Sequence, residues 1–138
     1  MMLKEIYTFG YGNCTSIEPL LFLVNKYKID LIVDVRARPR AWTPRWSAPY
    51  LSKQLGNKYT SITELGNTSG NAKWIPPDLE EANKKMIELC KMLSSVVLVC
   101  AEKDYRQCHR TEVAEKLSAL TCATVRHLSA DEALSLAV

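Results

Sequence analysis

Short runs of apolar residues recur along the chain, each of a length suited to one β-strand. The run from Leu31 to Arg36 is apolar on both faces, as expected of a central strand in a parallel sheet. The run at 58–65 is weaker because its polar and apolar residues alternate poorly. The predicted strands are 6–9, 31–36, 58–65, 95–100 and 125–128.

The segments between these runs carry apolar residues at helical spacing, and each is preceded by a polar residue that can cap a helix. For the helix before the last strand, Asp104 with Gln107 three residues later forms a capping box. Its apolar positions, extended back toward the N-terminus, place Arg106, His109 and Arg110 on the side that faces the sheet. The five predicted helix starts are at Thr15, Ser47, Asp78, Asp104 and Ser129.

This regular alternation of strands and helices predicts the fold class. We expect an α/β fold in which a mostly parallel sheet of about five strands is flanked by helices in three layers. The 138 residues suffice for one domain with a real core and are too few for two comfortable ones. We therefore predict a single domain over residues 1–138.

Composition adds limits on compartment and partners. The net charge of +3 is mild, and 47% of the residues are hydrophobic, as in ordinary soluble proteins. Five irregularly spaced cysteines and no secretory segment predict a reduced, cytoplasmic compartment, with cysteines that are buried, catalytic or metal-binding. No apolar run approaches the roughly 20 residues of a membrane span, so we expect no membrane partner.

Candidate chemistry gathers where the predicted strands end, because the carboxyl ends of parallel strands share one edge of the sheet. The strand at 95–100 ends in a cysteine, and Cys108-His109-Arg110 opens the next helix. Thiols become reactive, and anions bind, beside basic groups at a helix N-terminus. The candidate catalytic residues are Cys100, Cys108, His109, Asp34 and Glu102. The candidate anion-binding residues are Arg36, Arg38, Arg40, Arg106, Arg110, Gly10, Tyr11, Gly12 and Asn13.

The roles of these residues stay open at this point. Cys108 lies beside groups that lower a thiol pKa, whereas Cys100 lies deeper and has acidic neighbours. His109 is either a general acid or base or a residue that fixes the loop through backbone carbonyls. Asp34 either acts as a base or orients an arginine, or it forms an ion pair that holds the turn.

Two further possibilities concern the same two cysteines. Both could bind a metal together with His109, although their spacing matches no common zinc pattern and a fourth ligand is missing. Alternatively, Cys100 and Cys108 form a buried structural pair. No cofactor is assigned by the sequence.

A separate candidate surface is the proline-rich stretch 36–46, where arginines alternate with Trp42 and Trp46 and no acidic residue occurs. Aromatic rings among arginines can stack nucleic-acid bases or cover a substrate. They can also attach such a loop to the body of the protein. Nucleic-acid binding through this loop is therefore an alternative function.

Several motifs resemble one family. They are Thr8–Asn13, the strand Val33–Arg36 followed by Pro39-Arg40, Glu64-Leu65-Gly66, and Cys100-Ala101-Glu102-Lys103-Asp104 with Cys108-His109-Arg110. Together they resemble the family catalogued as domain of unknown function 488 over nearly the whole chain, and Tyr11 stands where that family often has histidine. The resemblance implies a small α/β domain and no settled activity.

A weaker likeness is to rhodanese-type sulfurtransferases and related phosphatases, which also place Asp-Val-Arg after one strand and a cysteine after another. The loop here lacks glycine and carries Glu102 and Asp104, which would repel a phosphate dianion. What remains is a thiol-and-arginine site. The sequence thus favours a small thiol-dependent enzyme, a transferase or hydrolase, whose cleft takes an anionic or nucleotide-like ligand.

Overall fold

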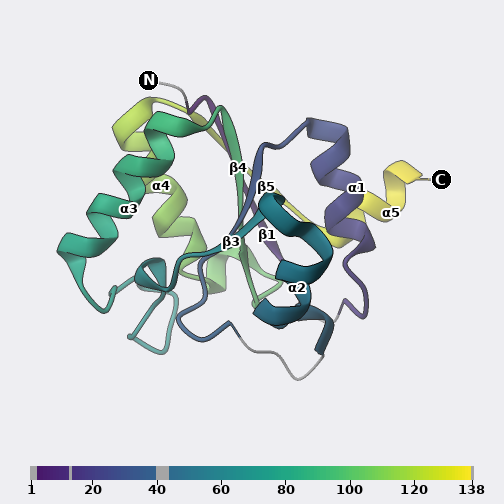
Figure 1. Ribbon diagram of the computed structural model, residues 1–138, viewed down its shortest axis with the longest axis horizontal. Coiled ribbons are helices and arrows are strands. Elements are labelled where there is room, and N and C mark those ends of the chain that lie inside the picture. Colours follow the sequence, from purple (N-terminus) through teal and green to yellow (C-terminus); the bar gives the residue numbers. More distant parts are fainter. Residues whose placement is uncertain (1–2, 13, 40–43, 138) are drawn as a thin grey trace.

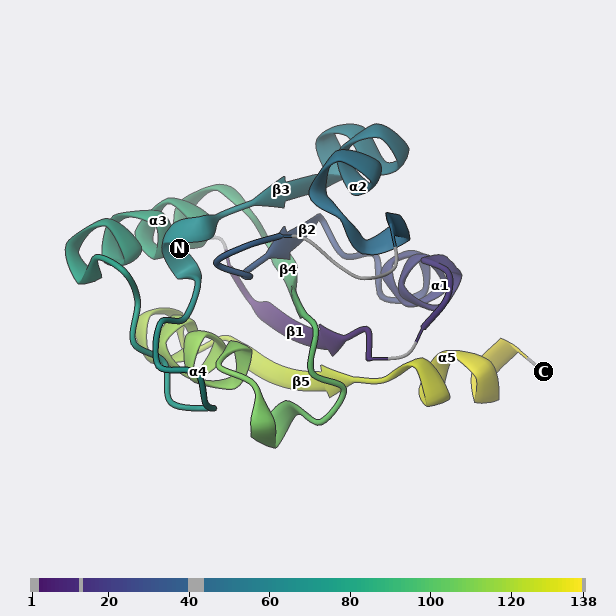
Figure 2. The same cartoon turned by 90° about the horizontal axis from the view of Figure 1, so that it is seen from below.

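The structure is a computed structural model, and it describes residues 3–12, 14–39 and 44–137. Within these ranges five strands form one sheet in the order β3-β2-β4-β1-β5, and every neighbouring pair is parallel (Figure 2). The strands are β1 (Glu5–Gly10), β2 (Leu31–Asp34), β3 (Tyr59–Ser61), β4 (Ser95–Cys100) and β5 (Thr124–Leu128).

Helices cover both faces of this sheet, which Figure 1 shows nearly edge-on. Two of them, α3 (Leu79–Met92) and α4 (Arg110–Thr121), lie on one face. The other face carries α1 (Glu18–Tyr27), α2 (Ala48–Leu55) and α5 (Ala130–Ala137). The predicted three-layer α/β fold with a parallel sheet is therefore confirmed. None of the described helices combines the length and the apolar character that crossing a membrane requires.

The central strand β4 is buried over its whole length and contributes to both halves of the core. Val96, Leu98 and Cys100 pack on the side of α3 and α4. Val97 and Val99 pack on the side of α1 and α2. This two-sided burial explains why the sequence of β4 is a continuous apolar run.

Local capping agrees with the predictions at some helices and differs at others. The Asp78 carboxylate accepts the Glu81 N–H at 3.1 Å and caps α3, as predicted. Thr15 does not cap α1, because that helix begins two residues later than predicted and its N-cap residue is Ile17. The predicted third strand is also shorter than expected, since a 3-10 turn at Thr63–Leu65 follows β3.

The segment between β4 and α4 contradicts the predicted helix start at Asp104. The Asp104 carboxylate instead accepts the Arg106 N–H at 2.9 Å and caps a 3-10 turn, η4 (Tyr105–Gln107). Cys108 is extended, with φ −127° and ψ 138°, so the chain leaves the turn before α4 begins. As a result His109 and Arg110 are buried as predicted, whereas Arg106 points to solvent, and its predicted position facing the sheet is wrong.

Pairing continues beyond the strand ends at the carboxyl edge. Gly10 is opposite Cys100 in the ladder, and the N–H groups of Tyr11 and Gly12 donate to the carbonyls of Cys100 and Ala101 at 3.1 and 2.8 Å. The backbone of Glu102 then lies directly against Gly10, where a Cβ atom would overlap the Glu102 carbonyl. Only glycine permits this close approach of the loop that follows Cys100.

Replacement of Gly10 by alanine should therefore destabilise the fold by about 2–3 kcal/mol, because the loop after β4 must move away. Urea unfolding measures the change. Gly56→Ala adds the same methyl group where no atom lies within 4 Å, so any loss there reflects only its backbone conformation, φ +57° and ψ −130°, which costs an alanine about 1–3 kcal/mol. A Gly10→Ala protein as stable as the wild type would contradict the close approach at Gly10.

Candidate functional site

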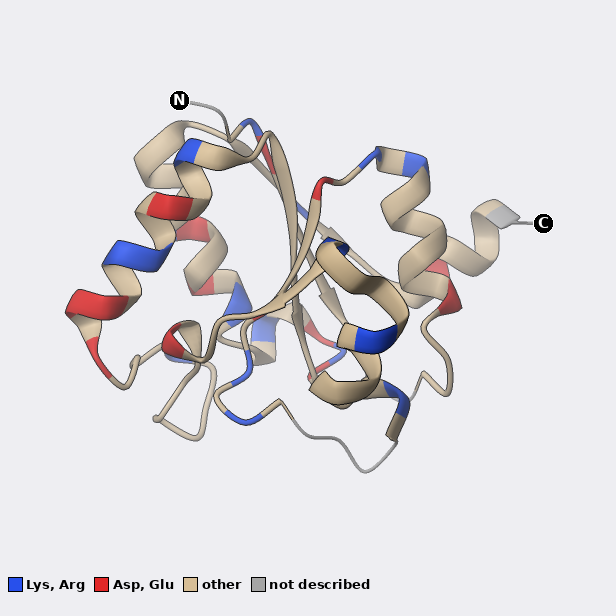
Figure 3. Cartoon of the chain, viewed as in Figure 1, with Lys and Arg blue, Asp and Glu red and all other residues tan. Residues whose placement is uncertain are grey.

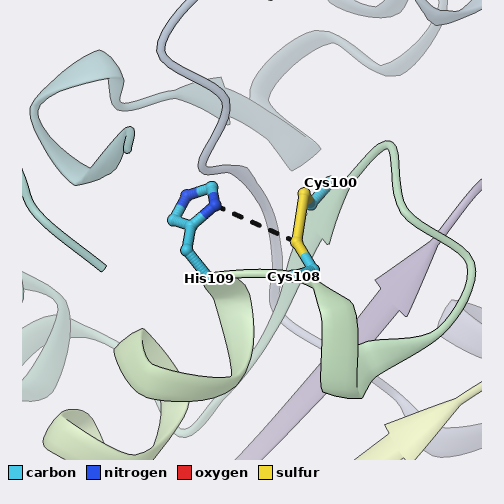
Figure 4. Close-up of side chains that lie close together, drawn as sticks. All are labelled: Cys100, Cys108 and His109. Atoms are coloured by element: carbon cyan, nitrogen blue, oxygen red, sulfur yellow. Dashed lines mark hydrogen bonds between the residues drawn. A yellow bond between two sulfur atoms is a disulfide. The ribbon is translucent and has the colours of Figure 1, made fainter. Parts of the chain in front are cut away.

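The sulfur atoms of Cys100 and Cys108 are joined in a disulfide at the carboxyl edge of the sheet (Figure 4). Cys100 is the last residue of β4, and Cys108 lies between η4 and α4. Both residues are buried, with 6% and 3% of their surface exposed. The described cysteines outside this pair, Cys14, Cys90 and Cys122, are free thiols. The sequence predicted that Cys100 and Cys108 lie close together, but it did not predict the bond between them.

His109 occupies the N-cap position of α4 beside this disulfide. Its Nε2 lies 2.8 Å from the Val35 carbonyl and 3.1 Å from the Leu65 carbonyl. Carbonyl oxygens only accept hydrogen bonds, so these partners assign the ring hydrogen to Nε2. The Nδ1 atom is left with a lone pair, and it lies 3.9 Å from the sulfur of Cys108 (Figure 4).

The electrostatic surroundings keep the His109 ring neutral. Burial lowers the pKa of His109, and the positive charge of Arg110 acts in the same direction. The bonds to the two backbone carbonyls oppose this change without reversing it. A neutral ring at physiological pH keeps the Nδ1 lone pair available to the neighbouring sulfur.

Arg110 is fully buried at the start of α4 and binds backbone rather than a carboxylate. Its Nη1 donates to the Glu102 carbonyl at 2.6 Å, and its Nη2 donates to the Lys103 carbonyl at 3.3 Å. Its Nε has no hydrogen-bond partner among the described residues. Burial lowers the pKa of Arg110 to about 10, so the side chain stays positively charged at neutral pH. Arg110 thus holds the loop after Cys100 and keeps a positive charge at this edge.

Asp34 and Arg36 form a buried ion pair at the end of β2. Asp34 accepts hydrogen bonds from Arg36 Nε at 2.8 Å and Nη2 at 2.6 Å, and from the Tyr59 hydroxyl at 2.6 Å. Burial would lower the pKa of Arg36, but the hydrogen bonds and charge of Asp34 outweigh it and raise that pKa. These contacts favour the ion-pair interpretation of Asp34 over a role as a base.

The ends of β2 and β4 lie side by side, as the sequence suggested. However, Arg36 after β2 and Cys100 at the end of β4 point to different faces of the sheet. The Val35 N–H donates to the Val99 carbonyl at 3.1 Å. Arg36 contacts the Tyr11 hydroxyl at 3.1 Å and the Trp46 carbonyl at 2.6 Å, both on the side of α1 and α2. The two bonded cysteines belong to the core on the side of α3 and α4. The sheet therefore separates Arg36 from the disulfide.

The other candidate residues occupy varied positions. The side chains of Arg38 and Glu102 are exposed, and Arg106 is exposed in an ion pair with Asp104, at 3.0 Å. The N–H groups of Tyr11 and Gly12 are used in the backbone pairing described above. Asn13 and Arg40 lie outside the described residues. Anion binding by this set stays a prediction.

The stretch 36–46 is anchored to the body of the protein where it is described. Trp46 is fully buried, stacks on Tyr11 with ring centroids 4.6 Å apart, and donates from Nε1 to the Cys14 carbonyl at 2.9 Å. Arg45 donates to the Thr15 carbonyl at 2.7 Å. Trp42 lies outside the described residues, and nucleic-acid binding here stays a prediction.

The helix with the most charged residues, α3, carries charges of both signs. Figure 3 shows acidic and basic residues alternating along α3. Two exposed ion pairs lie there, Lys84 with Glu81 at 3.1 Å and Lys85 with Glu88 at 4.0 Å.

Several residues that surround the site come from distant segments and were not among the predicted site residues. Val35 and Leu65 orient His109 through their carbonyls, which no side-chain pattern can reveal. Trp74 in the loop 66–77 is buried and donates from Nε1 to the Gly66 carbonyl at 2.9 Å. The backbone N–H of Trp74 donates to the Glu112 carboxylate at 3.0 Å, and this bond connects the loop to α4. In the sequence, the signal for this contact was a large apolar residue, Trp74, inside an otherwise polar loop that ends in two prolines.

Replacement of Asp34 by asparagine should destabilise the protein by about 3–5 kcal/mol, because the Arg36 guanidinium loses its counter-charge in a buried position. Chemical denaturation followed by circular dichroism measures the loss. Glu81→Gln is the matched control: its partner Lys84 is exposed, and the expected loss is below about 1 kcal/mol. An Asp34→Asn protein as stable as the wild type would show that the pair does not hold this turn.

Comparison with known proteins bears on the family. The model of the family described as Domain of unknown function DUF488 matches residues 16–117, a range that includes Cys100, Cys108 and His109. Neither the curated proteins nor the solved structures include a match to this chain. The weaker likeness to rhodanese-type sulfurtransferases stays a prediction. Because the match covers most of its length, the chain belongs to the family Domain of unknown function DUF488.

Proposed function

We propose that the chain is a thiol-dependent redox enzyme in which Cys100 and Cys108 alternate between a disulfide and two thiols. One observation carries the proposal: the two sulfurs are bonded to each other beside the Nδ1 lone pair of His109. A single disulfide next to three free thiols is unlike an oxidised structural framework. In a reducing compartment an isolated disulfide of this kind is typically catalytic or redox-sensing.

Cys108 is better placed than Cys14 and Cys90 to exist as a thiolate. It lies just before α4, whose first N–H groups favour a negative charge, and Arg110 adds a positive charge nearby. Burial raises the thiol pKa of Cys14 and of Cys90, which makes both less reactive. Cys108 is buried as well, but there the helix N-terminus and Arg110 oppose the effect of burial. The reactive sulfur chemistry is thus expected at the Cys100–Cys108 pair.

The proposed reaction is thiol–disulfide exchange with a second thiol compound. A thiolate of the donor attacks the Cys100 sulfur, the Cys100–Cys108 bond breaks, and Cys108 leaves as a thiolate. In the resulting mixed disulfide, one donor sulfur is bonded to Cys100. A second thiolate of the donor attacks that donor sulfur, closes the donor disulfide and releases Cys100 as a thiolate. Two electrons and two protons pass from the donor to the cysteine pair. In the reverse direction the Cys100 thiolate attacks a substrate disulfide and releases one substrate thiolate. His109 Nδ1 accepts the proton of Cys108, and the Cys108 thiolate then attacks the Cys100 sulfur of the mixed disulfide and releases the second substrate thiolate.

A small substrate fits this site better than a protein substrate does, because Cys100 and Cys108 are only 6% and 3% exposed. The charge of Arg110 is met by carbonyl groups rather than by a bonded carboxylate. A positive charge of this kind favours an anionic substrate. We therefore propose a small anionic thiol or disulfide as the substrate class.

The cysteine pair should be reduced reversibly in the native protein. After alkylation in denaturant, mass spectrometry should find three modified cysteines in the oxidised chain, namely Cys14, Cys90 and Cys122. After treatment of the native chain with a dithiol, it should find all five. A pair that stays bonded in the native chain throughout dithiol treatment would overturn the proposed function.

Turnover provides the second part of this test. With a dithiol as reductant and a small anionic disulfide as substrate, Cys100→Ser and Cys108→Ser should abolish turnover. Cys122→Ser is the matched control and should retain it, since Cys122 is an exposed free thiol at the other end of α4. Equal turnover in all three variants would assign the activity to other groups.

His109→Gln should slow the alkylation of Cys108 by iodoacetamide about a hundredfold in the reduced chain, because the proton acceptor beside that sulfur is lost. The rate is measured in the presence of a chelator by peptide mass spectrometry. His127→Gln is the matched control, since His127 lies on β5 and bonds Thr8 instead of a cysteine. Unchanged rates in His109→Gln would remove His109 from the proposed chemistry.

A further inference from the structure

Three atoms of the site are of the kinds that bind metal ions in proteins, and they lie close together. The sulfurs of Cys100 and Cys108 and a ring nitrogen of His109 lie within 4.8 Å of one another, and all three residues are buried. We propose that the reduced form of this site binds one divalent cation of the zinc type through these three residues. The proposal rests on the cysteine pair being reducible, as in the proposed function, but it does not require exchange with a substrate.

The distances suit a tetrahedral ion. With zinc–sulfur bonds near 2.3 Å and zinc–nitrogen bonds near 2.0–2.1 Å, ligand atoms in a tetrahedral site lie roughly 3.5–3.8 Å apart. His109 Nδ1 and the Cys108 sulfur are already 3.9 Å apart. When the disulfide is reduced, its two sulfurs move apart to van der Waals contact, which is close to the same separation. Small shifts at the end of β4 and the start of α4 therefore suffice.

The surroundings of His109 match those of a metal-bound histidine. Such a ring typically donates its second N–H to a backbone carbonyl or a carboxylate, which fixes the tautomer and the ring orientation. Here Nε2 lies 2.8 Å from the Val35 carbonyl and 3.1 Å from the Leu65 carbonyl, so Nδ1 is directed at the sulfurs (Figure 4). This arrangement is made by segments distant in sequence, and it leaves Nδ1 with the lone pair that a metal needs.

Charge and ligand number are also consistent with such an ion. Two thiolates and one neutral imidazole around a divalent cation give a site with no net charge, which a buried position tolerates. Three protein ligands leave one coordination position for water or substrate, as in catalytic zinc sites. The absence of a fourth ligand in the sequence pattern is thus a property expected of a site with an open position.

The redox state of the cysteines controls this site. In the disulfide neither sulfur is a thiolate, so the ion has lost two of its three ligands. Two molecules of a thiol reductant give up two electrons and two protons, become a disulfide, and convert the pair to two thiols. The two thiols then release two protons as they bind the cation. The same residues therefore alternate between a metal-free disulfide and a metal-bound dithiolate.

Cobalt(II) binding to the full chain tests this proposal, because cobalt takes zinc sites and reports their geometry. Chain reduced by a phosphine and kept free of oxygen should bind one equivalent of Co²⁺, with sulfur-to-cobalt charge-transfer absorption and the strong visible bands of a tetrahedral ion. Zinc should displace the cobalt. The same chain in the disulfide form should show neither band, and thiol titration on the same sample establishes how much of the pair is reduced.

Variants separate this site from the other sulfur and imidazole groups. Cys100→Ser and Cys108→Ser should each lose the tetrahedral spectrum, and His109→Gln should weaken binding more than about tenfold. Cys122→Ser and His127→Gln are the matched controls and should bind as the wild type does; circular dichroism verifies the fold of each variant. A reduced pair that binds neither ion would overturn this proposal and leave the exchange function standing. A pair that cannot be reduced would overturn both.

Discussion

Parallel pairing on both sides of β4 is the constraint on which the arrangement of this protein depends. Hydrogen bonds to β1 on one side and to β2 on the other carry the carboxyl ends of three strands to one edge of the sheet. The strand is buried on both faces, so its last side chain, Cys100, enters the core beneath α4. The cysteine is thereby positioned by the sheet and not by a flexible loop.

The loop after Cys100 brings the chain back to the Cys100 sulfur within eight residues. Arg110 binds the carbonyls of Glu102 and Lys103, and Gly10 allows their backbone to pass close to β1. The η4 turn, capped by Asp104, shortens the path to Cys108. These backbone contacts explain how a residue eight positions after Cys100 can reach its sulfur.

The two faces of the carboxyl edge have different chemical characters. On one face Asp34, Arg36 and Tyr59 satisfy one another in a buried network, and such a network stabilises the fold when it is complete. On the other face His109 keeps a lone pair directed at sulfur, and Arg110 keeps a charge bound only to carbonyl groups. Chemistry is expected on the second face because its groups retain unused bonding capacity. The membership in Domain of unknown function DUF488 places this arrangement in a family without an assigned activity.

The sequence by itself determined the elements and the neighbours along the chain. Apolar runs and helical periodicity follow from side-chain burial, so the strands, the helices and their alternation were predictable, and so was the cluster of Cys100, Cys108 and His109 around one strand end. The capping role of Asp104 was not, since a 3-10 turn and a helix begin with the same residues. Only the tertiary structure decided the bond between the two cysteines, the face on which Arg36 lies, and the orientation of His109. That orientation depends on the carbonyls of Val35 and Leu65, 74 and 44 residues away, and backbone groups of this kind leave no mark in a side-chain pattern.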